Sequence, residues 1–347
     1  MNTPEWTVVG AGPAGIVVIG KLIDSGCDPK TILWVDPAFA VGDLGQKWSE
    51  VLGNTDVKLF RDYLNSCRSF CLQECDIDFA INHLPSGQTC KLSHVVEPLK
   101  WITERLIKKV RVLKEFVTEI EHKGGYWVFK TSSGVVKSKK IILAIGAKPK
   151  KLHIDGYYGK IISLKNALNP NLLKDACNES DVVAVFGSSH SAIVAMYNLM
   201  DRNVKKIINF YKSPLKYTFF QENYTLYTYN GIKGYAADWA RQNLEEKLPD
   251  NLQRIHISDE QFMEKLNECS KAVYAVGFER RTFPKILPYG YLPYDQFLGI
   301  LAKGLFGIGI GFPELKKDAL GVSEYAIGLI DFAEYADKIL KIWSVYE

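Results

Sequence analysis

The sequence predicts an α/β fold in which one unit, made of a strand, a glycine loop and a helix, is used twice. Three observations predict it. The unit is complete near the N-terminus, the same order returns after Asp181, and β-rich runs between the two copies end in glycine. Parallel strands joined by a helix wind right-handedly into one sheet. A chain of 347 residues has room for two such sheets.

The first unit begins at the N-terminus. An apolar run predicts a buried strand at Trp6–Val9, and helical apolar spacing predicts a helix over residues 16–25, which Gly26 ends. A second strand is expected over residues 31–35, and it stops at Asp36. The glycine loop lies between the first strand and the helix, which is where such loops bind nucleotides.

The first loop satisfies the GxGxxG pattern, and the residues expected to contact a ligand are Gly10, Gly12, Pro13, Ala14 and Gly15. Gly10 permits the tight turn, Gly12 lets the backbone approach a pyrophosphate, and Gly15 lets the helix pack closely on the strand. The helix N-terminus offers free N–H groups and partial positive charge. Asp36 is expected to accept a hydrogen bond from a ribose hydroxyl. The alternative is a glycine-rich turn with a solvated Asp36.

A helix and a small meander are expected after the first unit. Apolar spacing favours an amphipathic helix over residues 101–116, and β-rich runs follow at Tyr126–Thr131 and at residues 135–145. The last strand ends at Gly146, where the chain is expected to leave the first domain.

The second unit repeats the order, with strands expected at Val182–Phe186 and Lys206–Tyr211 and a helix over residues 191–200. The sequence GSSHSA between them keeps the first glycine of the pattern and has small residues at the other two positions. Small residues still allow close approach, so nucleotide binding is favoured over a structural turn for Gly187, Ser188, Ser189, His190 and Ser191. For His190, nucleotide contact or capping is favoured over general acid or base chemistry.

The residues after the second unit's last strand indicate which nucleotide it binds. The first unit has Asp36 at this place, whereas the second has Tyr211, Lys212 and Ser213, with no acidic residue. A carboxylate would repel a 2′-phosphate, and Lys212, with Lys216 nearby, would attract one. The sequence therefore predicts NADPH rather than NADH.

The C-terminal part is expected to return to the first domain. A strand over residues 272–276 ends at Gly277, residues 305–311 alternate glycine with apolar residues, and residues 323–343 favour a long amphipathic helix. An aromatic-rich region over residues 217–235 has no assigned structure. A substrate pocket, a docking surface and ordinary core packing all remain open for it.

This organisation predicts a discontinuous domain with a second nucleotide-binding domain inserted in it. The boundaries expected are residues 1–150 and 285–347 for the first domain and residues 151–284 for the second.

Composition and charge limit the partners. Hydrophobic residues make up 47% of the chain and charged residues 24%, and the formal net charge of +4 is not gathered in one block. Nucleic-acid binding is therefore not indicated. Because the sequence shows neither a secretory leader nor an apolar stretch of about 18 residues, we expect a cytoplasmic protein without a membrane partner.

The seven cysteines include no CxxC pair, so a disulfide scaffold is not expected. Cys67, Cys71 and Cys75 recur every four residues, which would place them on one face of a helix. Small buried residues are favoured there over redox or metal chemistry. No metal is expected, because no histidine stands at ligand spacing from them.

The two glycine loops resemble those of the flavoproteins with two dinucleotide-binding domains, a superfamily that spans thioredoxin reductase-like enzymes and flavin-containing monooxygenases. The resemblance covers almost the whole chain. Gly146 in AIGAKP and Gly277 in AVGFERR are similar to the strand ends that link the two domains, and Gly309 in LFGIGIGFPE is similar to the segment that covers the flavin. The resemblance implies FAD on the first loop and NADPH on the second.

The segment GQKWSEVLGNTDVKLF resembles one that lies beside FAD in the monooxygenase branch, which implies that Trp48, Asn54 and Thr55 are flavin neighbours. GSSHSA resembles the NADPH loop of N-hydroxylating monooxygenases. The cysteine pairs of the disulfide reductases are missing, as is the histidine of the FxGxxxHS pattern of monooxygenases.

The function expected is an FAD-dependent NADPH oxidoreductase that resembles the flavin monooxygenases. Hydride would pass from NADPH to FAD, followed by reaction with O2 and a small soft nucleophile or ketone. Two alternatives stay open. One is a reductase of a small thiol, quinone or protein acceptor, and the other is a nucleotide-binding sensor or interaction protein without turnover. The sequence does not identify a catalytic residue, because the cofactors carry the chemistry.

Overall fold

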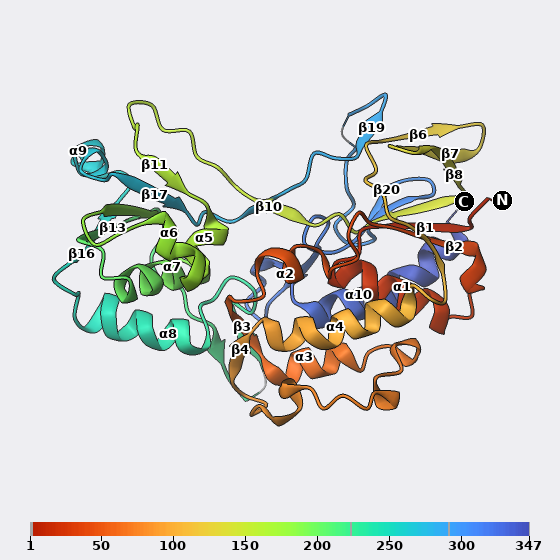
Figure 1. Ribbon diagram of the computed structural model, residues 1–347, viewed down its shortest axis with the longest axis horizontal. Helices are drawn as coiled ribbons and strands as arrows, with labels where there is room; N and C mark the ends of the chain where they lie inside the picture. The colour runs from red at the N-terminus through yellow and green to blue at the C-terminus, as the bar shows by residue number, and fades with distance from the viewer. Residues whose placement is uncertain (1–2, 223, 291, 347) are drawn as a thin grey trace.

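The computed structural model describes residues 3–222, 224–290 and 292–346. Figure 1 shows an elongated molecule of two lobes, one of which contains both chain ends. Each lobe is built on a sheet of parallel strands with helices packed against it. The α/β fold class with two dinucleotide-binding units is confirmed.

The sheet of the lobe with the chain ends has the order β20-β21-β9-β1-β2-β5. All neighbouring strands are parallel except β20 and β21. The strands are β1 (Trp6–Val9), β2 (Ile32–Val35), β5 (Arg111–Leu113), β9 (Lys140–Leu143), β20 (Ile300–Ala302) and β21 (Leu305–Gly307). Segments from both ends of the sequence therefore share this sheet.

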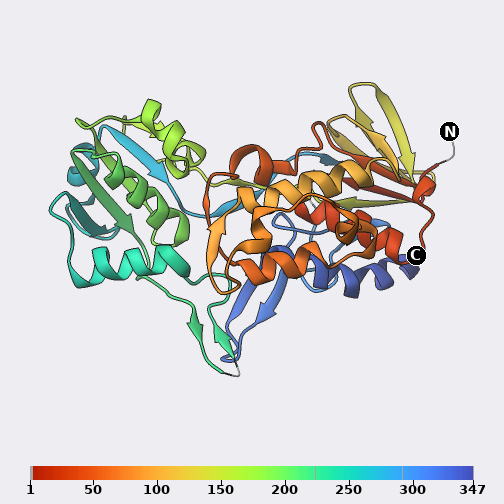
Figure 2. The same ribbon diagram turned by 60° about the horizontal axis from the view of Figure 1, so that its bottom comes forward.

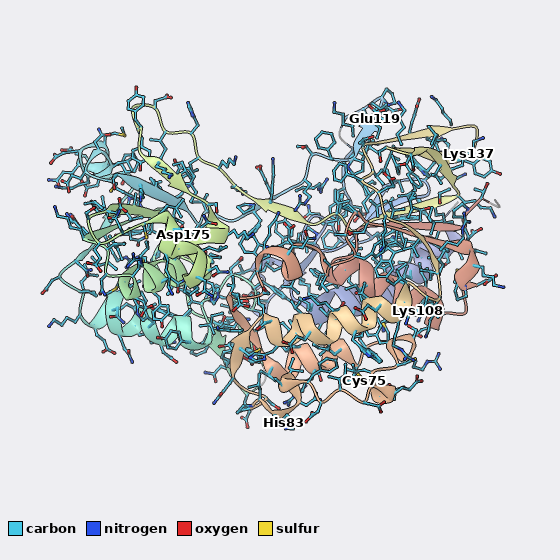
Figure 3. The ribbon with its side chains drawn as sticks, viewed as in Figure 1. Cys75, His83, Lys108, Glu119, Lys137 and Asp175 are labelled. Atoms are coloured by element: carbon cyan, nitrogen blue, oxygen red, sulfur yellow. The ribbon has the colours of Figure 1, made fainter. Side chains whose placement is uncertain are left out.

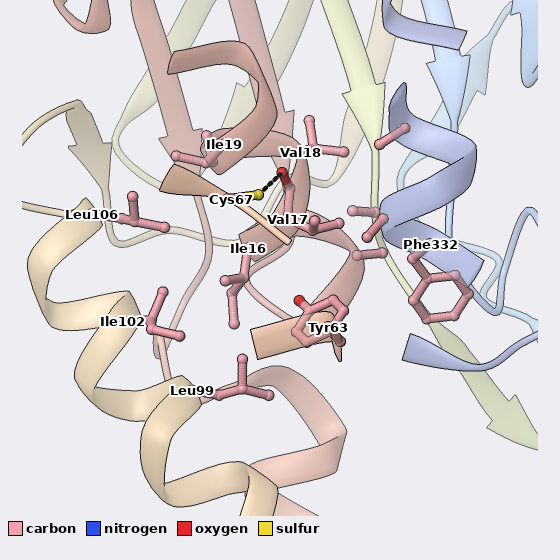
Figure 4. Packing of buried hydrophobic residues seen from close by; sticks show 14 of the residues in the cluster. Ile16, Val17, Val18, Ile19, Tyr63, Cys67, Leu99, Ile102, Leu106 and Phe332 are labelled. Atoms are coloured by element: carbon pink, nitrogen blue, oxygen red, sulfur yellow. Dashed lines mark hydrogen bonds between the residues drawn. The ribbon is translucent and has the colours of Figure 1, made fainter. Parts of the chain in front are cut away.

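Helices cover one face of this sheet and a smaller sheet covers the other. The helices are α1 (Pro13–Asp24), α3 (Val57–Leu64), α4 (Ser93–Leu106) and α10 (Leu329–Val345). Figure 4 shows their apolar side chains in one core, with Ile16 and Val17 of α1 beside Tyr63, Leu99 and Phe332. The smaller sheet has the order β19-β6-β7-β8 and consists of β6 (Glu119–Lys123), β7 (Tyr126–Thr131), β8 (Gly134–Ser138) and β19 (Lys285–Leu287). This gives the lobe three layers.

The sheet of the second lobe has the order β11-β17-β12-β13-β16, with every pair parallel. The strands are β11 (Lys160–Ile162), β12 (Val182–Phe186), β13 (Lys206–Tyr211), β16 (Leu252–His256) and β17 (Lys271–Tyr274). One face packs on α5 (Leu164–Leu168), α6 (Pro170–Ala176), α7 (His190–Asp201), α8 (Gly234–Ala240) and the π-helix η5 (Arg241–Glu246), and the other packs on α9 (Phe262–Asn267).

Two paired strands join the lobes. β10 (Ala147–Pro149) leaves the first lobe, β18 (Phe278–Arg280) returns to it, and the two pair antiparallel. Figure 1 shows β10 crossing between the lobes.

Two hairpins provide a second contact between the lobes. β14 (Phe219–Phe220) and β15 (Thr225–Leu226) belong to the second lobe, and β22 (Glu314–Lys317) and β23 (Ser323–Ala326) belong to the first. Figure 2 shows the two hairpins side by side below the lobes. After β15, the N–H groups of Tyr229 and Asn230 donate to the Glu324 carboxylate, both at 3.3 Å.

Shorter elements complete the chain. α2 (Gly42–Lys47) follows β2, and β3 (Leu52–Asp56) pairs with β4 (Thr89–Lys91). The 3-10 helices are η1 (Pro29–Thr31), η2 (Arg68–Phe70), η3 (Leu72–Glu74) and η4 (Ala80–His83).

Four predicted strands are confirmed residue for residue: Trp6–Val9, Tyr126–Thr131, Val182–Phe186 and Lys206–Tyr211. The helix predicted over residues 101–116 is confirmed over residues 101–106 and wrong beyond them. α4 begins at Ser93 and ends at Leu106, and residues 111–113 pair instead with β2. Here the edge of a buried sheet overrides the local helical spacing.

The helix predicted over residues 323–343 is wrong in its first turn and a half. Residues 323–326 form β23, in which buried and exposed side chains alternate, and α10 begins only after Gly328. Glu324 and Ala326 are buried, and Tyr325 between them is exposed. This alternation is typical of a strand.

Candidate functional site

The first glycine loop connects β1 to α1. Gly10 has φ +111°, and a Cβ there would overlap the carbonyl oxygen of Ala144, just after β9. A Cβ at Gly15 would overlap the carbonyl oxygen of Gly10. At Gly12, in contrast, φ is −80° and the atom nearest to an added Cβ is the Gly42 Cα, at 3.9 Å. The backbone thus requires glycine at positions 10 and 15, whereas Gly12 leaves space for a ligand.

The N-termini of α1 and α7 are suited to an anion. Gly12 occupies the N-cap of α1, with Pro13 directly after it, and Ser189 occupies the N-cap of α7. Within the described residues, neither cap residue gives a side-chain hydrogen bond to its helix. First-turn N–H groups have no partner within a helix, and the helix dipole adds partial positive charge. Both helix N-termini can therefore bind a pyrophosphate.

Asp36 lies directly after β2 and is 9% exposed. Its Oδ2 accepts a hydrogen bond from the N–H of Ala11 at 2.8 Å, and its Oδ1 accepts from Ala38 at 2.8 Å and Phe39 at 2.7 Å. The carboxylate therefore holds the first loop from the neighbouring strand. Because a carboxylate offers about four lone-pair sites, one remains for a ribose hydroxyl.

The second loop repeats the backbone geometry of the first. Gly187 has φ +121°, and a Cβ there would overlap the carbonyl oxygen of Ala275, just after β17. The Gly187 carbonyl accepts a hydrogen bond from Asn209 Nδ2 at 2.8 Å, and the Gly10 carbonyl accepts one from Trp34 Nε1 at 2.9 Å. In each unit, a side chain of the next strand therefore holds the loop by its first carbonyl.

Lys212 is exposed after β13, and its carbonyl accepts a hydrogen bond from His256 Nε2 at 3.0 Å. Tyr211 ends β13 where Asp36 follows β2 in the first unit. The guanidinium of Arg254, from β16, lies 4.5 Å from the centre of the Tyr211 ring. Sequence reasoning missed Arg254 because it lies on a strand that had not been predicted.

A cavity of about 880 Å³ lies between the lobes. Five predicted site residues line it, namely Asn54, Ser189, His190, Ser191 and Gly277. Apolar walls come from the end of β9, from the segment between β18 and β20, from β20 itself and from the segment after β21. They include Leu143, Ile145, Ile286, Leu292, Leu301 and Phe312. A mainly apolar cavity with a few polar groups at a domain interface is the usual form of a small-molecule site.

The segment after β21 connects the first loop to this cavity. Gly309 has φ +89°, and a Cβ there would lie 2.6 Å from the Cβ of Ala14 at the start of α1. Gly311 lines the cavity, and a Cβ there would lie 2.5 Å from the carbonyl oxygen of Gly146. Three predicted site residues, Ala14, Gly146 and Gly309, are therefore gathered around one short segment.

His190 begins α7 and reaches across to the first lobe. Its Nε2 donates to the carbonyl of Leu52 in β3 at 2.9 Å, and its Nδ1 is buried without a hydrogen-bond partner in the part of the chain that the structure describes. Burial lowers the pKa of His190, and the charge of Lys233 adds to this effect, while the Leu52 carbonyl opposes it. A neutral imidazole that joins the two lobes suits a positioning role better than proton transfer.

Two of the predicted flavin neighbours lie beside the cavity rather than in it. Trp48 follows α2 and packs edge-on against Phe278, with ring centres 6.0 Å apart, and Phe278 lines the cavity. The Oγ1 of Thr55 lies 3.5 Å from the Oδ1 of Asn54. Of this group, Asn54 is the residue that lines the cavity.

The cavity wall is positively charged. Lys150, Arg280 and Arg281 line it, and no aspartate or glutamate does so within the described ranges. Arg281 Nη2 pairs with Asp43 Oδ2 at 2.5 Å, and Arg280 Nε donates to the Gly311 carbonyl at 2.8 Å. Sequence reasoning missed both arginines because it interpreted AVGFERR only for its glycine. The segment contains the two arginines but gives no sign of what they contact, since the fold alone brings Asp43 and Gly311 to them.

The three regularly spaced cysteines do not share a helical face, so that prediction is wrong. α3 ends at Leu64, and the following segment forms separate 3-10 turns, with Cys71 at φ +51°. Cys67 is buried under α1, its Sγ 3.9 Å from the Val17 carbonyl (Figure 4), and burial raises its pKa to about 12. Cys75 lies on the outer side of the lobe, away from the second lobe (Figure 3).

No group of three or more His, Cys, Asp or Glu side chains could hold a metal ion among residues 3–222, 224–290 and 292–346. Over the same residues, no helix is long and apolar enough to cross a membrane.

Comparison with solved structures identifies the fold. A flavin-containing monooxygenase from Stenotrophomonas maltophilia matches with a TM-score of 0.68 at 13% identity over 100% of this chain and 99% of its own. An oxidized steroid monooxygenase bound to NADP matches with a TM-score of 0.62 at 14% identity over 99% and 85%. Lactococcus lactis thioredoxin reductase matches with a TM-score of 0.58 at 14% identity over 99% of each chain. The chain therefore has the fold with two Rossmann domains of these oxidoreductases.

No protein-family model matches the chain. A curated relative, monooxygenase AgnR1 of Paecilomyces divaricatus, is 30% identical, and the alignment covers 99% of each protein. At this identity over the full length, the chain is an oxidoreductase that belongs to the family of monooxygenase AgnR1.

Proposed function

We propose that the protein is a flavin-dependent monooxygenase that binds FAD at the first glycine loop and NADPH at the second. One observation carries this proposal. The cavity between the lobes is lined both by the second loop, through Ser189 and His190, and by Gly311, whose segment packs on the first loop. Groups bound at the two loops would thus face the same cavity.

The residues of the first loop fit FAD. Gly12 leaves open space where a pyrophosphate would approach, the uncapped N-terminus of α1 offers N–H groups, and Asp36 keeps a free acceptor for a ribose hydroxyl. Asn54 supplies a polar contact inside the cavity. We infer that Trp48 and Thr55 support this wall through Phe278 and Asn54 rather than by touching the flavin.

The residues of the second loop fit NADPH. Gly187 and the uncapped N-terminus of α7 give a pyrophosphate the same approach as in the first unit, and Ser188 lies in the loop. Tyr211 stands where the first unit has Asp36, and the next residue, Lys212, is exposed, so no carboxylate opposes a 2′-phosphate there. The NADP-bound steroid monooxygenase shares this fold.

When bound, the two cofactors would supply hydride transfer from NADPH to FAD and the oxygen chemistry of the flavin. The chain's own residues bind, orient and exclude water. Lys150, Arg280 and Arg281 compensate the charge of anionic ligands, and the apolar wall that includes Ile286 and Phe312 keeps water from the reacting groups.

The domain boundaries belong to this proposal. We infer an FAD-binding domain of residues 1–150 and 285–347 and an NADPH-binding domain of residues 151–284. The strand pairings support it, because β20, β21 and β19 join sheets of the first lobe. β10 and β18 mark the two crossings.

Two measurements test the function. The visible spectrum of the purified protein should contain the bands of bound flavin. NADPH oxidation should consume O2, and labelled 18O2 should appear in the product when a panel of amines, sulfides and ketones is supplied. NADPH oxidation that continues without O2 in the presence of a quinone or disulfide, with no labelled product from any panel member, would instead identify a reductase.

A further inference from the structure

The guanidinium of Arg254 holds an unpartnered donor at the edge of the second sheet. Arg254 lies on β16 in register with Asn209 of β13. Its Nε donates to Asn209 Oδ1 at 3.1 Å. Its Nη2 is buried and has no hydrogen-bond partner among the residues that the structure describes. A buried charged donor without a partner is costly, so this N–H group is available to the acceptor atom of a ligand.

Asn209 connects this guanidinium to the second glycine loop. Its side chain is fully buried, and its Nδ2 donates to the carbonyls of Val185 at 2.9 Å and Gly187 at 2.8 Å. The Asn209 amide therefore positions both the second glycine loop, which would bind the pyrophosphate, and the guanidinium of Arg254. In the first unit, the residue at the same place is Trp34, whose indole has a donor for the Gly10 carbonyl but no acceptor for an arginine.

The location is the one at which the adenosine ribose of a nucleotide would lie. Tyr211 ends β13 at the carboxyl edge of the sheet, and nucleotides bind along that edge in parallel sheets. The ring of Tyr211 covers the guanidinium at 4.5 Å. The first unit has its ribose acceptor, Asp36, at the corresponding place. The second unit therefore presents a cation where the first presents a carboxylate.

The charges around Arg254 leave it positive. Burial lowers its pKa, while Tyr211, Tyr217 and Glu245 act in the opposite direction. An arginine with this balance stays protonated at neutral pH. The planar fork of the Arg254 guanidinium can bind two phosphate oxygens at once, which the single ammonium of Lys212 cannot do in the same way. Lys212 is also exposed, so solvent screens its charge.

We propose that Arg254 is the residue that selects a nicotinamide nucleotide carrying a 2′-phosphate. This inference rests on the proposed function, because it requires a nucleotide at the second loop. Nη2 binds the phosphate, and Asn209 fixes the guanidinium for that contact. Because Nη2 is buried, the phosphate has to displace neighbouring side chains, among them the half-buried Tyr211, whose ring lies against the guanidinium.

The test measures binding rather than turnover. Isothermal titration of the purified full-length protein with 2′,5′-ADP and with 5′-AMP compares two ligands that differ by the 2′-phosphate. The variants are Arg254→Met, which keeps the apolar stem, and Arg254→Lys, which keeps a charge without the fork. Arg241→Met is the matched control, because this arginine also lies 4.5 Å from a tyrosine ring, that of Tyr217, yet pairs with Asp238.

Arg254→Met should weaken 2′,5′-ADP binding by about 10- to 100-fold and 5′-AMP binding by less than about 3-fold. Arg254→Lys should recover part of the preference, and Arg241→Met should keep the wild-type ratio of the two affinities. If Arg254→Met fails to fold, Arg254→Lys decides alone, because a full wild-type ratio in that variant overturns the role of the fork.

The titrations distinguish a failure of the inference about Arg254 from a failure of the proposed function. Unchanged 2′,5′-ADP binding in Arg254→Met, with tight binding by the wild type, overturns this inference and leaves the proposed function standing. An equal loss for both ligands in Arg254→Met also overturns it, because a merely structural role moves both affinities. Wild-type protein that binds neither ligand refutes nucleotide binding at the second loop, and the proposed function with it.

Discussion

Alanine at Gly12 should separate cofactor binding from folding. An added Cβ would lie 3.9 Å from its nearest protein atom, an ordinary contact, and φ −80° suits alanine. The unfolding free energy of Gly12→Ala should therefore change by less than about 1 kcal/mol. The methyl group would nevertheless fill the space that a pyrophosphate needs. At about 1–3 kcal/mol for such overpacking, FAD should bind roughly 5- to 150-fold more weakly.

Gly15→Ala is the contrasting variant. Its Cβ would overlap the backbone carbonyl of Gly10, which cannot move without displacing β1. We expect a loss of about 3 kcal/mol or more and a Tm lower by roughly 6–12 °C. The assays are differential scanning fluorimetry of the apoproteins and FAD titration followed by flavin fluorescence. If Gly12→Ala binds FAD within about 2-fold of wild type while folding normally, the first loop is not the pyrophosphate site.

Three further outcomes are expected. Because burial lowers the pKa of His190, the unfolded chain binds this proton more readily than the folded one, and stability should fall as the pH drops below the ordinary histidine value of 6.5. The Tm of His190→Asn should consequently fall less than that of wild type between about pH 7.5 and about pH 5, and parallel curves would contradict this. Asp331 accepts hydrogen bonds from Tyr229 Oη at 2.6 Å and Lys316 Nζ at 2.7 Å, so Asp331→Asn should cost about 1–3 kcal/mol in urea unfolding. An additive double-mutant cycle with Tyr229→Phe would show that this contact between the lobes contributes nothing. Cys67 should react with iodoacetamide at least about 100-fold more slowly than Cys71 or Cys75 in native protein, as peptide mass spectrometry would measure, and equal rates would refute its burial.

The elements that could be predicted from the sequence are those whose pattern is local. Val182–Phe186 and Lys206–Tyr211 are short β-branched and apolar runs bounded by turns, and they form strands at those residues. Residues 111–113 could not be assigned in this way. They form a strand because they pair with the edge of β2. The spacing of apolar residues within 111–113 does not depend on this distant partner and so could not predict the strand.

The same distinction holds at the site. Gly10 and Gly187 could be found because tight turns at strand ends need glycine. Arg254 and Arg281 could not, because their meaning comes from what they face. Arg281 reaches Asp43, and Arg254 reaches Asn209, across separations that only the folded chain closes. The role of a residue that depends on such a contact cannot be predicted from the segment that contains it.

The pairing of β10 with β18 has a mechanical consequence. Both covalent connections between the lobes run side by side in one hydrogen-bonded ribbon. Two connections that lie together define one axis, so a rotation of one lobe relative to the other would take place about this ribbon. Such a rotation would move His190 away from Leu52 and open the far side of the cavity without unfolding either sheet. The ribbon would be the axis of that rotation, and the hydrogen bonds that Glu324 and His190 make between the lobes would oppose it.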